Sequence, residues 1–237
     1  MDLMIYGLIF GCFIPFLARK ISKLIPATAG YILLKIFMPS HYMPWRKLKQ
    51  NPKYIELFDR YLMRSLGWGI FTAAITYAFQ VIFDGAYIGW YIAFLWILLL
   101  LVEIDKRSML LPDILTIPLL ILGFGYASQH GTWLATQDLS FISYEENSAL
   151  GAMFGYVLPI ISSMFVVWKY PNAFGGGDIK LLCAIGAWVG FEFIAYIIVL
   201  SCFIFAISCL IHKMRAGPFG PAIVYATLII VLLFFGM

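Results

Sequence analysis

The chain has 237 residues, of which 63% are hydrophobic and 12% charged, and its formal net charge is +4. Soluble domains usually carry about 25% charged residues, and the apolar residues here run in long stretches, so an ordinary soluble globular protein is excluded. The composition predicts an all-α, polytopic protein of the lipid bilayer. No basic patch with interleaved aromatic residues indicates a nucleic-acid partner.

Eight apolar segments are predicted as transmembrane helices, with the N-terminus outside, because a span takes roughly 20 apolar residues. In chain order they are 3–18, 64–83, 86–104, 109–127, 149–168, 179–190, 192–212 and 219–236. The first is expected to be a retained span, since Asp2 precedes it and basic residues follow it. The sixth is too short to cross the hydrocarbon alone at about 1.5 Å per residue, and we expect a short or tilted helix.

One larger cytoplasmic loop, 19–63, is predicted between the first two spans. Its apolar stretch 29–38 is too short to span and is expected to lie along the membrane interface. Lysine and arginine concentrate in cytoplasmic segments, and this topology places all 16 basic residues there. The loop 128–148, on the other side, carries acidic residues and no basic ones. The charge distribution therefore supports the predicted orientation.

Metal chemistry is not predicted. Four cysteines lie inside apolar runs without a CxxC pair, and three histidines are scattered: Cys12, Cys183, Cys202, Cys209, His41, His130 and His212. The cysteines are interpreted as small apolar side chains.

Four carboxylates are expected at the cytoplasmic ends of spans: Glu103, Asp105, Asp113 and Asp178. A charged side chain at membrane depth costs about 2.5 kcal/mol or more and commonly marks function. Asp105 ends the third predicted span, and Asp178 opens the sixth. Because both lie on the same predicted membrane face, they are candidates for one site.

A pair of neighbouring carboxyl groups can hydrolyse a peptide bond. One holds a proton and the other stays charged, since two like charges close together are costly. The charged group takes a proton from water while the protonated one donates to the carbonyl oxygen, without a covalent intermediate. Glycines before Asp178 would let a substrate strand approach the backbone closely.

Structural interpretations of the same residues stay open. Asp178 could be the N-cap of its helix, with the preceding glycines as a hinge. Asp105 could be a solvated span end beside Lys106 and Arg107. Asp113, after Pro112, would suit a helix dipole, and Glu103 would snorkel or pair with a cation. An alternative function is a small cation-coupled transporter that uses Asp105, Asp113 and Asp178.

Three motifs are similar to those of one enzyme family. They are the run Ile104-Asp105-(x)6-Pro112-Asp113-(x)2-Thr116-x-Pro118, the run Gly175-Gly176-Gly177-Asp178-Ile179-Lys180, and Gly217-Pro218-Phe219-Gly220-Pro221. They resemble the first aspartate motif, the GxGD motif and a Pro-Phe-Gly-Pro element of the type IV prepilin peptidases, which are membrane aspartic proteases. Gly11-Cys12-Phe13 to Arg19 looks like the family's first span, so the resemblance covers nearly the whole chain.

The resemblance implies an endopeptidase that removes the short basic leader of type IV prepilins or pseudopilins after a glycine. It would lie in the bacterial cytoplasmic membrane with its active site facing the cytoplasm. By matching position, Asp105 and Asp178 would be the catalytic pair. The supporting residues would be Asp113, which is also the alternative first carboxylate, and Gly175, Gly177 and Lys180.

The loop departs from the pattern of many relatives. Those members carry paired CxxC motifs that bind zinc, and many also N-methylate the new N-terminus with S-adenosylmethionine. Here residues 40–46 contain no cysteine, so zinc is not expected, and S-adenosylmethionine would be needed only if methyl transfer is retained. The implied division is 1–63, a span and a basic loop without the zinc motif, and 64–237, the protease core.

Overall fold

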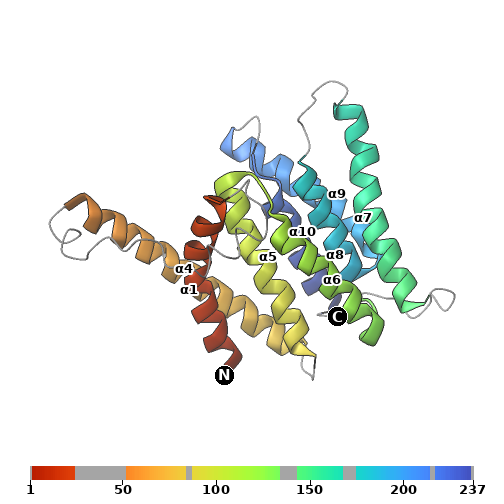
Figure 1. The fold of residues 1–237 in the computed structure, drawn as a ribbon, viewed down its shortest axis with the longest axis horizontal. Helices are drawn as coiled ribbons and strands as arrows, with labels where there is room; N and C mark the ends of the chain where they lie inside the picture. Colours follow the sequence, from red (N-terminus) through yellow and green to blue (C-terminus); the bar gives the residue numbers. More distant parts are fainter. Residues whose placement is uncertain are drawn as a thin grey trace. The chain divides into compact units, whose positions relative to one another are not determined.

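The computed structural model describes residues 2–24, 52–83, 87–133, 143–167, 175–213 and 217–235, and every regular element in them is a helix (Figure 1). The all-α prediction is confirmed for these residues. The helices are α1 (Asp2–Ser22), α4 (Pro52–Ile82), α5 (Ile88–Ser108), α6 (Asp113–His130), α7 (Tyr144–Val167), α8 (Gly176–Val189), α9 (Phe191–His212) and α10 (Gly220–Phe235). The predicted interfacial stretch 29–38 lies outside the described residues.

Each described helix coincides with one predicted span, although several boundaries differ by three residues or more. Helix α4 begins at Pro52, inside the predicted loop 19–63, and α5 continues beyond 104 to Ser108. Helix α7 begins at Tyr144 rather than 149, because Ser143 and Glu146 form a capping box. The Ser143 amide donates to Glu146 Oε2 (2.9 Å), and the Glu146 amide donates to Ser143 Oγ (3.2 Å).

Four described helices are long and apolar enough to cross a membrane, over Leu3–Ser22, Arg60–Ile82, Ile88–Ser108 and Phe191–His212. Helix α10 is apolar but shorter, and α8, with 14 residues, is about 21 Å long. The short sixth helix is thus confirmed, whereas the full set of eight spans stays a prediction.

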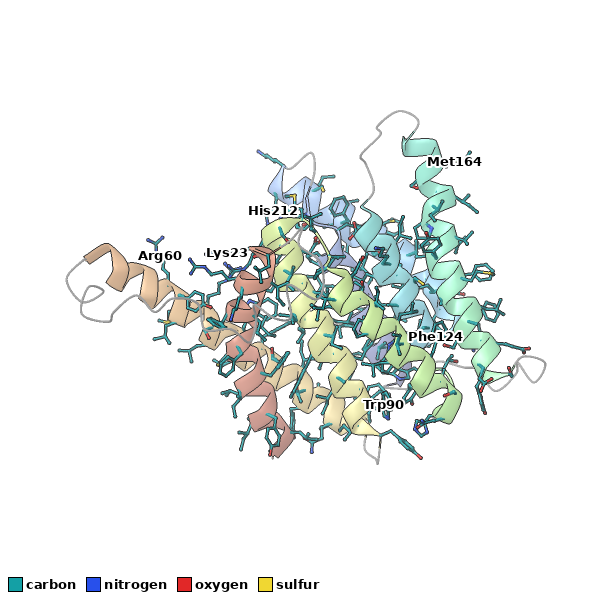
Figure 2. All side chains as sticks on the ribbon, in the orientation of Figure 1. Lys23, Arg60, Trp90, Phe124, Met164 and His212 are labelled. Carbon is teal, nitrogen blue, oxygen red and sulfur yellow. The ribbon has the colours of Figure 1, made fainter. Side chains whose placement is uncertain are left out.

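Large apolar side chains cover the outer surface of several helices. Figure 2 shows one of them, Met164, pointing away from α7, where it is 74% exposed. On α9, side chains more than half exposed recur along the whole helix: Tyr196, Val199, Phe203, Ile207, Leu210 and Ile211. Apolar surface on this scale suits lipid rather than water. The chain is a multi-pass membrane protein.

The chain forms two compact units, Met1–Arg107 and Ser108–Met237. In the first, α1 crosses and packs against α4 (Figure 1), so closely that a Cβ on Gly11 would lie 2.6 Å from the Trp68 carbonyl oxygen. Trp96 of α5 stacks on Phe10 of α1, with ring centroids 4.5 Å apart, and donates a hydrogen bond to Thr76 of α4 (3.2 Å). Side-chain contacts therefore join the three helices that the structure describes in this unit.

In the second unit, α8 packs against both α6 and α7 (Figure 1). Gly151 and Gly155 of α7, four residues apart, face Leu182 and Gly186 of α8. A Cβ on Gly151 would collide with the Gly186 carbonyl, and one on Gly155 with the Leu182 carbonyl. Small residues at this spacing let two helix backbones approach closely, as in many membrane helix pairs.

A buried tryptophan connects α8 to α6. Trp188 is fully buried, donates from Nε1 to the Leu119 carbonyl (2.8 Å) and stacks on Tyr126, with ring centroids 5.5 Å apart. On the α7 side, Ser148 Oγ donates to the Ala187 carbonyl (2.6 Å). These contacts fix α8, the helix that begins with the GxGD motif.

Candidate active site

Asp105 lies in the last turn of α5 and is 3% exposed. The interpretation of Asp105 as an ordinary solvated span end is therefore wrong, because α5 continues to Ser108 and the side chain is buried. A carboxyl group is rarely buried to this degree in a protein unless it has a partner.

Glu103, two residues earlier, is fully buried and is bound to α4. Its Oε1 accepts a hydrogen bond from Arg107 Nε (2.8 Å) and forms an ion pair with Arg64 Nη2 (2.8 Å), and its Oε2 accepts a hydrogen bond from Trp68 Nε1 (3.1 Å). The predicted pairing role of Glu103 is confirmed. The Glu103–Arg107 spacing of four residues was readable in the sequence. Arg64 and Trp68 were not predicted, since no local pattern links them to Glu103.

Asp178 is the third residue of α8, in the first turn, and is partly exposed. The N-cap is Gly175, which has extended backbone angles and makes no side-chain capping bond. The interpretation of Asp178 as the N-cap is therefore wrong. A Cβ on Gly175 would lie 2.8 Å from Asp178 Oδ2, so the carboxylate leans back over the Gly175 backbone.

The three glycines before Asp178 differ in their surroundings. A Cβ on Gly177 would lie 2.9 Å from Leu111 Cβ and 3.3 Å from the Leu111 amide nitrogen, whereas one on Gly176 meets nothing within 4 Å. The first and third positions of the GxGD motif are therefore sterically restricted, and the second is not. Leu111, just before α6, is a site neighbour that the sequence did not reveal.

Asp113 is the first residue of α6, with Pro112 as its N-cap. This is the predicted position in the first turn, where the helix dipole favours a carboxylate. Lys180 Nζ donates to both Asp113 oxygens, at 2.7 and 2.8 Å. The second unit thus brings together Asp113, Gly177, Asp178 and Lys180 where α6 and α8 begin.

The Pro-Phe-Gly-Pro element forms the start of α10 in the same unit. Helix α10 begins at Gly220, and Phe219 packs edge-on against Phe205 of α9, with ring centroids 5.2 Å apart. Gly220 and Pro221 are buried. The element therefore has a packing role between α9 and α10.

The two candidate catalytic aspartates belong to different compact units, Asp105 to the first and Asp178 to the second. Their predicted pairing stays a prediction. Within the described residues, no group of three or more His, Cys, Asp or Glu side chains is arranged to hold a metal ion. The loop segment 40–46, on which the zinc expectation was based, lies outside them.

The chain is similar to known proteins over the region that contains these residues. Residues 92–210, half of the chain, match the type IV leader peptidase family. Three proteins named prepilin leader peptidase/N-methyltransferase are similar. The one from Vibrio cholerae is 33% identical over 140 residues, or 56% of this chain and 51% of the relative. The one from Dichelobacter nodosus is 32% identical over 175 residues (70% and 55%). The one from Pseudomonas aeruginosa is 32% identical over 162 residues (59% and 51%).

The chain spans about half the length of these curated relatives. No solved structure matches it significantly. The matched region begins inside α5 and ends inside α9, so it includes both candidate aspartates and Lys180.

Proposed function

Because the chain belongs to the type IV leader peptidase family, we propose that it is an aspartic endopeptidase of the bacterial cytoplasmic membrane. Its substrates are type IV prepilins or pseudopilins, whose short basic leader it removes after a glycine at the cytoplasmic face. The observation that carries this proposal is the pair of unusual carboxylates in the matched region. Asp105 is buried in α5, and Asp178 is held over Gly175 at the start of α8.

The helix ends suggest which carboxylate takes which role. The N-terminus of a helix stabilises negative charge, and Asp178 lies in the first turn of α8. Asp105 lies in the last turn of α5, where the helix dipole disfavours negative charge. We therefore assign Asp178 as the charged base and Asp105 as the protonated acid.

In this mechanism Asp178 takes a proton from a water molecule, whose oxygen adds to the scissile carbonyl carbon. Asp105 donates its proton to the carbonyl oxygen, so the tetrahedral intermediate forms without a covalent bond to the enzyme. When the intermediate collapses, the hydroxyl group formed from the carbonyl oxygen returns its proton to Asp105, and the carbon–nitrogen bond breaks. The departing amine receives the proton held by Asp178. The two carboxyl groups are then back in their starting states.

The other residues of the site support this chemistry by position. Asp113, Gly177 and Lys180 hold the first turn of α8 against the start of α6, and Gly175 leaves room for the Asp178 carboxylate. Proteolysis by this route needs no cofactor. S-adenosylmethionine enters only if the chain also methylates the new N-terminus. The names of its relatives include N-methyltransferase.

Co-expression with a prepilin that has a short basic leader tests the proposal, with leader removal followed by mass. We expect Asp105→Asn and Asp178→Asn each to abolish cleavage. Glu146→Gln, which alters an exposed acidic side chain in the first turn of α7, is the matched control and should cleave normally. Full cleavage by either aspartate variant would remove that residue from the catalytic pair. The same spectra show whether the mature N-terminus gains a methyl group.

A further inference from the structure

We propose that Glu103 is a positioning residue that sets the rotation of α5 about its own axis and thereby aims Asp105. The inference rests on the proposed peptidase activity. It is carried by the contacts of Glu103, a fully buried carboxylate whose two oxygens accept two hydrogen bonds, from Arg107 and Trp68, and which forms an ion pair with Arg64.

The contacts of Glu103 restrict both rotation and sliding of α5 against α4. Arg64 and Trp68 lie one turn apart on α4, and they bind different oxygens of Glu103. Arg107, one turn further along α5, binds the same oxygen as Arg64. An apolar contact would tolerate sliding and rotation, whereas a carboxylate fixed through both oxygens holds one face of α5 against α4.

Helix geometry links this anchor to Asp105. An α-helix turns about 100° per residue, so Asp105 projects about 200° from Glu103, with an axial rise of about 3 Å. Anchoring Glu103 on α4 therefore directs Asp105 to the opposite side of α5. A small rotation of the helix would move the Asp105 carboxyl group directly, because both residues lie in the same turn.

A structural role alone would predict something different. Breaking a buried ion pair destabilises a protein, and the activity loss would then follow the loss of folded protein. A positioning role predicts a loss of kcat in protein that remains folded, since misplacement by about 1 Å can cost roughly a hundredfold in rate. The two roles are distinguished by measuring kcat in variants whose folded protein is equally stable.

The chain offers a matched control on the same helix pair. Trp96 of α5 donates to the buried Thr76 of α4, at 3.2 Å, in a second polar contact between these helices. Trp96 lies nine residues before Asp105, or about 14 Å along the helix. Thr76→Val removes this acceptor at nearly constant volume, so it weakens the α4–α5 contact far from the aspartate.

The experiment uses the full chain in lipid nanodiscs, with a prepilin-type substrate and measurement of kcat, KM and thermal stability. We expect Glu103→Gln to lower kcat by about tenfold or more, with KM within about twofold of the parent. Glu103→Asp should retain part of the rate, and Trp68→Phe, which removes only the donor to Oε2, should lower kcat by about two- to threefold. Thr76→Val should keep the parental kcat even where its melting temperature falls.

The positioning role would be overturned if Glu103→Gln kept the parental kcat. It would also be overturned if Thr76→Val lost as much kcat as Glu103→Gln for the same fall in melting temperature. If Glu103→Gln does not fold, Trp68→Phe carries the same test. A parent that cleaves no prepilin would instead overturn the proposed function itself. A second readout is the ¹⁹F NMR spectrum of protein labelled with 5-fluorotryptophan, in which the signal of Trp68 is identified by its loss in Trp68→Phe. We expect the Trp68 signal to shift in Glu103→Gln and to stay unchanged in Thr76→Val.

Discussion

Lys180 donates hydrogen bonds to both carboxylate oxygens of Asp113, at 2.7 and 2.8 Å, and so joins the first turn of α8 to the first residue of α6. Both side chains are about half exposed, 48% and 49%. Exposed ion pairs contribute roughly 0–1 kcal/mol, so this one adds little to the free energy of unfolding. We expect the ion pair to act by positioning Asp178, because Lys180 follows Asp178 by two residues in the same turn of α8.

The first prediction concerns this ion pair. Lys180→Met should lower leader cleavage by roughly three- to tenfold through a misplaced Asp178, while the free energy of unfolding changes by less than about 1 kcal/mol. Asp113→Asn should have a similar effect. The double variant should be no worse than the more severe single one, because the two residues act through one contact. Cleavage rates and thermal unfolding of the three variants check this.

Asp113→Asn, compared with Asp105→Asn, decides which residue is the first carboxylate. If Asp113→Asn abolishes cleavage completely and Asp105→Asn does not, Asp113 belongs to the catalytic pair and Asp105 does not. Additive losses in the double variant would mean that Lys180 and Asp113 act independently, contrary to the contact between them.

The second prediction concerns Gly175, whose added Cβ would lie 2.8 Å from Asp178 Oδ2. Gly175→Ala should push the carboxylate to another rotamer and lower kcat by about tenfold or more, with little change in stability, since the side chain can move. Gly176→Ala is the matched control, with open space around its Cβ, and should cleave like the parent. Equal rates for the two variants would show that the Asp178 rotamer does not matter.

The third prediction concerns Gly177, where the obstacle is Leu111 just before α6. The Leu111 backbone nitrogen and oxygen both lie 3.3 Å from the added Cβ, and Leu111 Cβ lies at 2.9 Å. Gly177→Ala should therefore separate α8 from the start of α6 and reduce both stability, by about 1–3 kcal/mol, and cleavage. Thermal unfolding of Gly177→Ala and Gly175→Ala distinguishes the two variants, because only Gly177→Ala should be less stable than the parent. A stable, inactive Gly177→Ala protein would contradict this interpretation.

The helices were predictable because long apolar runs and charged ends are strong local signals in a membrane protein. Differences arose where polar chemistry extends or starts a helix. Helix α5 continues past its apolar run to Ser108, and the capping box of Ser143 and Glu146 starts α7 early. The capping box was present in the sequence as a Ser-x-x-Glu pattern, which an apolar-length criterion does not use.

The residues of the candidate site could be predicted from the sequence, but the contacts between them could not. The sequence indicated Glu103 as a snorkelling or pairing residue because charges are scarce in this chain, and the resemblance of the GxGD motif indicated Lys180 as a supporting residue. Their partners Arg64 and Asp113 lie 39 and 67 residues away, on other helices, and only tertiary packing selects them. The individual roles of Gly175 and Gly177 likewise depend on atoms that the motif itself does not contain.

The fourth prediction concerns the close approach of α7 and α8. Gly151 and Gly186 face each other so tightly that a Cβ on either would collide with the backbone carbonyl of the other. Backbone atoms cannot rotate away as a flexible side chain can, so Gly186→Ala should lower the free energy of unfolding by at least about 2 kcal/mol. Because α8 carries Asp178, the fraction of active protein should fall with it.

The matched control for this prediction is Gly125→Ala in α6, where an added Cβ meets nothing within 4 Å. Alanine is a better helix former than glycine, so this variant should be as stable as the parent or more stable by up to about 1 kcal/mol. Thermal unfolding of both variants in the same nanodiscs provides the comparison. Equal stability for Gly186→Ala and Gly125→Ala would show that α7 and α8 do not meet through these glycines, and the packing that fixes the start of α8 would have to be sought elsewhere.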